Sequence, residues 1–227
     1  FAAALDHKIS DFKRVYDVSK PIRVGRFRIN DHHPKESKLT LPGVFIHSSN
    51  IGTAIIAQEL GAEKQQAFYA KLGLLSPLNV EIPEASTPLL PERWGEASTM
   101  TTAYGHGIAV TPLHVIQATS ALVNGGFYRP ATFLRATTPP EADQTSTVIS
   151  ADTSHDVRRL LRLAVSHGTG KNGDTDGYIV GGKTGTAEKS TNGGYNEKAT
   201  LASFIGVFPM HNPRYAVLVV LDAVSYT

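Results

Sequence analysis

The chain has 227 residues, 41% of them hydrophobic and 19% charged, a composition typical of a globular protein with one or two cores. A formal net charge of +2 is too small to indicate nucleic-acid binding, and the absence of cysteine excludes disulfides, thiolate metal sites and a cysteine nucleophile. No apolar run approaches the roughly 18 residues of a membrane span, so we expect neither a spanning helix nor a signal peptide in this sequence.

The two ends of the sequence look incomplete. Phe1 to Leu5 is typical of the later part of a helix, because no capping residue precedes it. An apolar segment, Tyr215 to Ala223, closes the chain with almost nothing after it. We therefore expect the chain to be a piece of a longer protein.

The first half of the chain alternates irregular and helical segments. Residues 8–43 are polar and interrupted by proline and glycine, which predicts loops and short strands such as 22–29. Helical spacing of apolar residues predicts a helix over 51–60, and a second short helix follows over 63–72. Residues 75–107 are rich in proline and glycine, and we expect this long loop to line a site.

Two later helices have clear start signals. Thr111 followed by Pro112 predicts the N-terminus of a helix that ends before Gly125. The next helix begins near Asp152, and Arg158, Arg159 and Arg162 lie off its apolar face. We interpret those arginines as a solvated face and not as a binding patch.

The last 50 residues are predicted to be strands. Residues 178–186, 201–209 and 215–221 are the three candidates, and residues 189–198, with Asn192-Gly193, are predicted to form a hairpin connection. The third strand is apolar without alternation, which predicts a strand covered on both faces. Helices before and strands after indicate an α+β fold, with an antiparallel sheet packed between helices.

Metal and phosphate chemistry find little support. The nine histidines show no His-x-x-x-His pattern, so no metal site or cofactor is predicted. The segment Gly168 to Lys171 lacks the first glycine and the final Ser/Thr of a phosphate-binding loop.

A better candidate for chemistry lies at the end of the first predicted strand. Lys183 supplies a cation, the hydroxyls of Thr184 and Thr186 supply hydrogen bonds, and Gly185 allows a ligand to lie against the backbone. These residues suit an anion site, but a glycine-rich hairpin explains the tripeptide equally well.

A Ser-x-Asn triplet is the second element of interest. Ser48-Ser49-Asn50 stands at a helix start, where the hydroxyls either cap the helix or take part in catalysis. A second triplet, Ser190-Thr191-Asn192, lies in the hairpin and is interpreted as a turn. Together with a Ser-x-x-Lys, a Ser-x-Asn and a Lys-Thr-Gly are the three elements of penicillin-recognising enzymes.

Three longer segments follow one another in the order of a known family. His47–Gly52, Tyr104–Leu113 and Gly182–Lys189 resemble the transpeptidase domain of class B penicillin-binding proteins, which cross-link peptidoglycan. The resemblance covers nearly all of residues 1–227, read as the C-terminal part of that domain, and is greatest to septal, cell-division members from alphaproteobacteria.

The resemblance implies a D,D-transpeptidase site for a stem peptide ending in D-alanyl-D-alanine, which β-lactams imitate. It makes Ser48, Asn50 and Lys183 catalytic and gives Thr184, Gly185 and Thr186 to substrate binding. It also implies divisome membrane proteins as partners, no nucleic acid and no cofactor, and a periplasmic domain of a protein anchored in the inner membrane.

The family's nucleophilic serine is the main departure. In the family that serine and its lysine stand just upstream of the segment that matches Phe1–Leu5, so we expect them outside this chain. The Ser10–Lys13 segment has the Ser-x-x-Lys spacing, but it lies among polar residues and is interpreted as a surface pair.

Two other functions remain open. A serine β-lactamase or D,D-carboxypeptidase of the same superfamily would need a general base for deacylation, for which Glu81, Glu84, Glu92 and Glu96 are available but unmarked. A non-catalytic module that binds partners in the cell-wall machinery is the alternative from a different class.

Overall fold

The computed structural model describes residues 1–25, 27–31, 36–135, 146–191 and 194–222. Its α-helices are α1 Ala2–Asp6, α2 Leu41–Ile46, α3 Asn50–Leu60, α4 Ala62–Lys71, α5 Glu96–Thr102, α6 Pro112–Val123 and α7 Ala151–Ser166. Its strands are β1 Val15–Asp17, β2 Ile22–Val24, β3 Phe27–Ile29, β4 Lys38–Thr40, β5 Phe127–Tyr128, β6 Ser146–Thr147, β7 Gly181–Thr191, β8 Gly194–Phe208 and β9 Tyr215–Asp222.

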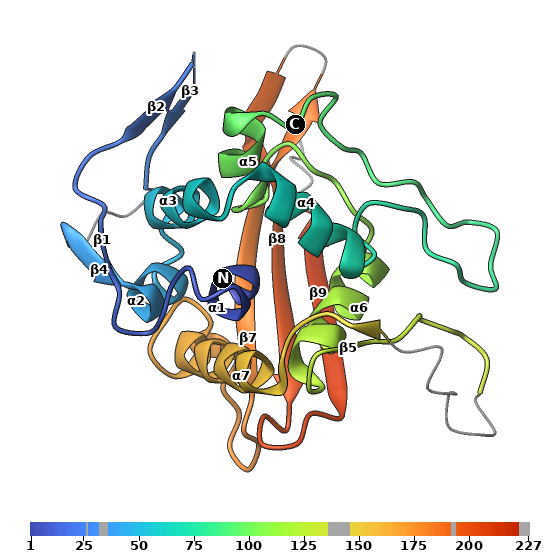
Figure 1. Cartoon of the computed structure of the whole chain (residues 1–227). Coiled ribbons are helices and arrows are strands. Elements are labelled where there is room, and N and C mark those ends of the chain that lie inside the picture. The colour runs from blue at the N-terminus through green and yellow to red at the C-terminus, as the bar shows by residue number, and fades with distance from the viewer. Residues whose placement is uncertain (26, 32–35, 136–145, 192–193, 223–227) are drawn as a thin grey trace.

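The largest sheet is antiparallel and has the strand order β7-β8-β9. In Figure 1, α1, α4, α6 and α7 lie in front of these strands, while α2, α3 and the small β1–β4 and β2–β3 pairs lie beside them. This confirms the predicted α+β class with an antiparallel sheet and helices. No helix in the described ranges is long and apolar enough to cross a membrane.

The predicted start of α6 is confirmed, and the structure adds the capping residue of α7. The Thr111 hydroxyl accepts the backbone N–H of His114 at the start of α6, and Pro112 is the first residue of that helix. Ser150 caps α7 in the same way, through the backbone N–H of Thr153.

Two helices were not predicted. The Leu-Pro-Gly start of α2 resembles a loop, but the Thr40 hydroxyl caps it, and Leu41 and Val44 are fully buried. The α5 sequence is rich in threonine, and the buried Gln65 side chain holds it by donating to the carbonyl of Thr99. Both segments are therefore helical because of their tertiary contacts and not because of their local sequence.

The prediction that the last strand is covered on both faces is wrong for the described residues. Val217 and Val219 of β9 are about half exposed, at 47% and 50%, while Ala216 and Leu218 on the other face are half-buried. The hairpin strands are also longer than predicted, since Thr191 pairs with Gly194. The predicted turn residues Asn192-Gly193 lie outside the described residues.

One core joins α2 and α3 to the middle of α7. Leu41, Val44, Ile51, Ala54 and Leu160 belong to one buried cluster. A second cluster, which includes Val157, Leu161 and Val207, fills the space between α7 and the sheet. These two clusters fix the helical part of the chain relative to β7 and β8.

The α2–α3 contact depends on a glycine. A Cβ built on Gly52 would lie 2.5 Å from Cγ2 and 2.7 Å from Cγ1 of Val44, whose side chain is fully buried and stiff. We expect Gly52→Ala to destabilise the domain by about 1–3 kcal/mol through overpacking, although alanine favours a helix over glycine.

The thermal midpoint of the variant in the intact protein measures this effect. Val44→Ala removes the two clashing methyl groups, so Gly52→Ala should cost less in that background than alone. An equal cost in both backgrounds would show that the contact with Val44 is not the cause.

Candidate active site

The turn between α2 and α3 presents one serine to solvent and buries the next. Only His47, Ser48 and Ser49 separate the two helices. Ser48 has φ +53°, a left-handed conformation that residues other than glycine seldom adopt. As a result the Ser48 side chain is exposed, while that of Ser49 is buried.

A carboxylate following β3 fixes the start of α3. The Ser49 hydroxyl accepts the backbone N–H of Gly52 and donates to Asp31 Oδ2 at 2.7 Å. The backbone N–H of Ile51 donates to Asp31 Oδ1 at 2.9 Å, so a negative charge lies at the positive end of the helix. Asp31 therefore holds the turn that carries Ser48, a role that nothing in its local sequence indicates.

Asn50 lies beside this turn as the first residue of α3. Its side-chain amide donates to the backbone carbonyl of Asn30 at 3.1 Å. The amide is therefore bound to the end of β3, and its Oδ1 is the atom left for other contacts.

Lys183 joins the sheet to this turn. It lies near the start of β7, and its ammonium group donates to Ser48 Oγ at 2.5 Å and to the carbonyl of Thr184 at 3.0 Å. The Nζ atom also lies 6.0 Å from the centroid of the Phe45 ring. The structure thus brings together two predicted catalytic residues that are 135 positions apart.

Burial changes the acidity of Lys183. Desolvation lowers the pKa of its ammonium group from 10.5 to about 8. Hydroxyl, carbonyl and ring contacts surround the charge, and none of the ion pairs found in the described ranges involves it. The lysine is therefore a cation at neutral pH that loses its proton more readily than an exposed lysine.

The next three residues of β7 follow the alternation of a strand. Thr184 and Thr186 lie on one face, and the Thr184 hydroxyl is 2.7 Å from the Thr169 hydroxyl. A Cβ built on Gly185 would lie 2.7 Å from Ser203 Oγ of β8. A side chain at position 185 would therefore require the Ser203 hydroxyl to rotate away, a constraint that the sequence did not show.

The other candidate motifs lie away from this site or outside the description. The interpretation of Ser10 and Lys13 as a surface pair is wrong for Ser10, which is buried with its hydroxyl 2.5 Å from the Tyr16 hydroxyl. This burial also argues against Ser10 as the nucleophile. The Ser190-Thr191-Asn192 triplet ends at Asn192, which is not among the described residues. The sequence marks Thr169 only as part of an incomplete phosphate loop, so its contact with Thr184 was missed.

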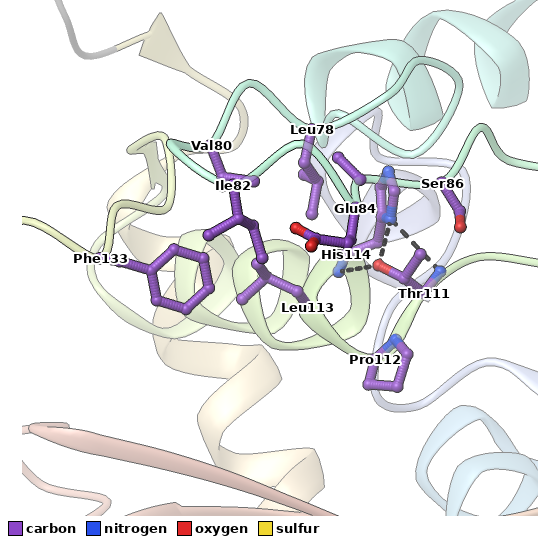
Figure 2. Close-up of a pocket in the computed structure, with 11 residues that line it drawn as sticks. Leu78, Val80, Ile82, Glu84, Ser86, Thr111, Pro112, Leu113, His114 and Phe133 are labelled. Atoms are coloured by element: carbon purple, nitrogen blue, oxygen red, sulfur yellow. Dashed lines mark hydrogen bonds between the residues drawn. The ribbon is translucent and has the colours of Figure 1, made fainter.

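The long proline-rich loop lines a different cavity. Figure 2 shows a pocket of about 270 Å³ between this loop and the start of α6, with apolar walls that include Leu78, Ile82, Leu113 and Phe133. The ring of His114 is fully buried beside it and is hydrogen-bonded to Thr111 and to the carbonyl of Ser76. The loop thus lines a cavity, but this cavity is not at Ser48 and Lys183, and its role as a site stays a prediction.

Comparison with known proteins decides the family. The family model described as the penicillin-binding protein transpeptidase domain matches residues 1–227. The chain belongs to this family. The resemblance inferred from the three sequence segments is therefore confirmed.

The relatives include transpeptidases of several bacteria. The chain is 37% identical to the probable peptidoglycan D,D-transpeptidase FtsI of Caulobacter vibrioides, over 97% of this chain and 39% of that protein. It is 32% identical to the probable peptidoglycan D,D-transpeptidase PenA of Neisseria meningitidis, over 97% of this chain and 38% of that protein. The chain thus spans about two fifths of the length of these curated relatives.

Solved structures share the fold of this transpeptidase-family chain. The transpeptidase domain of Burkholderia pseudomallei penicillin-binding protein 3 has a TM-score of 0.90 and 32% identity, covering 97% of this chain and 67% of that one. Penicillin-binding protein 3 of Mycobacterium tuberculosis, complexed with aztreonam, has a TM-score of 0.89 and 29% identity, and the match covers 97% of this chain and 54% of that one.

The lowered pKa of Lys183 has a measurable consequence for stability. Because the folded-state pKa is about 8 and the usual value is 10.5, the unfolded chain binds more protons between these values. We expect the free energy of unfolding to rise with pH across this window and the rise to be smaller in Lys183→Met. The free energy of unfolding of the wild type and of Lys183→Met is measured in denaturant at pH 7, 8, 9 and 10. If the two proteins show the same dependence on pH, the pKa of Lys183 is not lowered.

Proposed function

We propose that the protein to which this chain belongs is a peptidoglycan D,D-transpeptidase that cross-links stem peptides during septal cell-wall synthesis and is acylated by β-lactams. The observation that carries the proposal is the 2.5 Å contact between Lys183 Nζ and Ser48 Oγ. It joins the Ser-x-Asn turn to the Lys-Thr-Gly strand, two of the three elements that this chemistry requires.

The reaction is acyl transfer through a serine. The nucleophile, which the family resemblance puts upstream of Phe1, forms a bond to the carbonyl carbon of the penultimate D-alanine, and the terminal D-alanine leaves as an amine. An amine of a second stem peptide then displaces the serine oxygen and takes the acyl group. The leaving amine needs a proton in the first step, and the attacking amine loses one in the second.

Ser48 is suited to move this proton. A hydroxyl is both donor and acceptor, and the Lys183 ammonium already occupies one acceptor position of Ser48 Oγ. The Ser48 hydrogen is therefore free to point toward the leaving amine, and the nearby cation stabilises the oxygen as that proton departs. Asn50 holds an amide of the substrate through Oδ1, the side-chain atom left open by its bond to Asn30.

The β7 strand binds the terminal carboxylate, or the acid group of a β-lactam. The hydroxyls of Thr184 and Thr186 lie on one face of the strand, and Lys183 adds positive potential to the pocket. The backbone N–H of Thr186 contributes half of the oxyanion hole, and the nucleophilic serine contributes the other half.

The glutamates that a deacylating enzyme could use are engaged elsewhere or remote. The Glu81 carboxylate accepts from Thr132 and from the backbone N–H of Phe133, and Glu96 accepts from the Gln58 amide. Glu84 lines the pocket of Figure 2. In the described part of the chain none of these three carboxylates is hydrogen-bonded to Ser48 or Lys183, and two of them already accept other hydrogen bonds.

The same proposal covers location and partners. A septal transpeptidase acts on peptidoglycan, so we place this chain in a periplasmic domain of a protein anchored in the inner membrane. Divisome membrane proteins are the proposed partners, and the name FtsI of the Caulobacter relative supports this assignment.

Reaction of the intact protein with a fluorescent penicillin tests the proposal. We expect one long-lived acyl-serine, and peptide mapping should place it in the segment that precedes Phe1. A label that is hydrolysed within seconds would support the β-lactamase alternative. A label on Ser10 would contradict the motif assignment, and no label at all would support a non-catalytic binding module.

A further inference from the structure

The connection between α7 and β7, residues 167–180, forms one side of the site. The Thr169 hydroxyl is hydrogen-bonded to the Thr184 hydroxyl at 2.7 Å. A Cβ built on Gly168 would lie 2.9 Å from the carbonyl oxygen of Ile46, at the end of α2. The connection therefore lies against both elements that carry the site, the helix end before Ser48 and the strand of Lys183.

Little apolar burial holds this connection in place. Most of its residues from Lys171 to Ile179 are exposed, and Tyr178 and Ile179 are exposed by 59% and 48%. Its position must therefore depend on specific polar contacts and on close backbone packing.

Two kinds of polar contact hold the connection: the backbone N–H groups of Gly168 and Gly170 donate to the carbonyl of Ala164 at 3.1 and 3.0 Å, and one guanidinium group binds its later part. Arg162 of α7 donates to Asp174 in the connection, from Nη1 to Oδ1 at 2.7 Å and from Nη2 to Oδ2 at 3.1 Å. Nη1 also donates to the carbonyl of Val180 at 2.8 Å, directly before β7 begins. Only the planar fork of an arginine can bind a carboxylate through two nitrogens and a carbonyl at the same time.

The ring of Phe204 supplies the close packing. A Cβ built on Gly173 in the connection or on Gly182 in β7 would lie 2.5 Å from Cζ of this ring. The backbones of Gly173 and Gly182 therefore pack on the same side chain of β8, and a shift of either would lose that contact. Arg162 and Phe204 thus hold the later part of the connection and the start of β7, while the bonds of Gly168 and Gly170 to Ala164 hold Thr169 at the end of α7.

We propose that Arg162 is a positioning residue for the carboxylate-binding wall, and that it acts through Thr169. The proposal rests on the proposed function, since it assigns the Thr169–Thr184 hydroxyl pair to the terminal carboxylate of the substrate. When Arg162 is present, the connection holds Thr169 against Thr184, and the two hydroxyls are oriented before the ligand arrives. Without it, the start of β7 is no longer tied to α7 through the Val180 carbonyl, and the Thr184 hydroxyl moves away from Thr169.

This interpretation revises the expectation that the arginines of α7 are only a solvated face. Arg159 fits that expectation, since it pairs with Asp156 one turn away on the same helix and stacks on the ring of Phe12. Arg162 does not fit it, because its partners lie in the connection. In accord with the geometry, the Arg162 guanidinium lowers the pKa of the Asp174 carboxyl.

The test compares a ligand that has the carboxylate with one that lacks it. Acylation rates of the intact protein are measured with benzylpenicillin and with its methyl ester, for the wild type, Arg162→Ala and the matched control Arg159→Ala. We expect Arg162→Ala to slow acylation by benzylpenicillin roughly tenfold and acylation by the ester less than about twofold, because only benzylpenicillin has the carboxylate that the hydroxyl pair binds. Arg159→Ala should leave the ratio of the two rates unchanged.

Thr169→Val shows whether Arg162 acts through Thr169. We expect Thr169→Val to lower the ratio of the benzylpenicillin rate to the methyl-ester rate. The double variant Arg162→Ala/Thr169→Val should have a ratio no lower than that of the more severe single variant. Arg162→Lys should recover part of the ratio, since a lysine can satisfy one of the two partners. Asp174→Asn, which keeps the size of the side chain, should lower the ratio in the same direction and serves if Arg162→Ala does not fold.

Three results would overturn the inference: an unchanged ratio in a folded Arg162→Ala or Asp174→Asn protein, an equal loss for both ligands, or losses that multiply in the double variant. These outcomes differ from a failure of the proposed function, in which the wild-type protein is not acylated by benzylpenicillin at all.

Discussion

A single short contact, from the Lys183 ammonium group to the Ser48 hydroxyl, joins the helical part of this domain to its sheet at the site of the proposed chemistry. It combines a charge that burial makes less stable with a residue in an unfavourable backbone conformation. Neither feature favours folding by itself. Both are maintained because the buried clusters around α2, α3, α7 and the sheet fix the two elements independently of the contact.

Other residues fix the position of each partner in this contact. Asp31 binds the Ser49 hydroxyl and the start of α3, and so fixes the turn on which Ser48 stands. On the other side, Arg162 ties the segment before β7 to α7, and Phe204 packs against the glycine backbone at Gly182. The precision of the site thus comes from residues that are not expected to touch the substrate.

The features that the sequence predicted are those whose causes are local. The helices from 50 and 112 were predicted because apolar periodicity and a capping residue occur together within one segment, and the helix from 151 was predicted from its apolar periodicity. Ser48 and Lys183 were identified because family-specific segments surround them. The structure then showed that these two residues are in direct contact, which no sequence pattern states. What the sequence did not predict depends on contacts between distant segments. The Asp31–Ser49 and Thr169–Thr184 hydrogen bonds join residues 18 and 15 positions apart, and the surrounding sequence at Asp31 and Thr169 is that of an ordinary polar loop. Helix α5 depends on the buried amide of Gln65, and the reason for glycine at position 185 lies on the neighbouring strand.

Whether Ser48 and Lys183 work as one unit is tested most directly by a double-mutant cycle on the acylation rate. Ser48→Ala, Lys183→Ala and the double variant of the intact protein are compared with the wild type in their rates of reaction with benzylpenicillin, after thermal unfolding has shown that each is folded. If the contact is the functional unit, the double variant will be about as slow as the slower single variant. If the two losses multiply, the residues act independently, and the contact between Lys183 and Ser48 is not the basis of the chemistry.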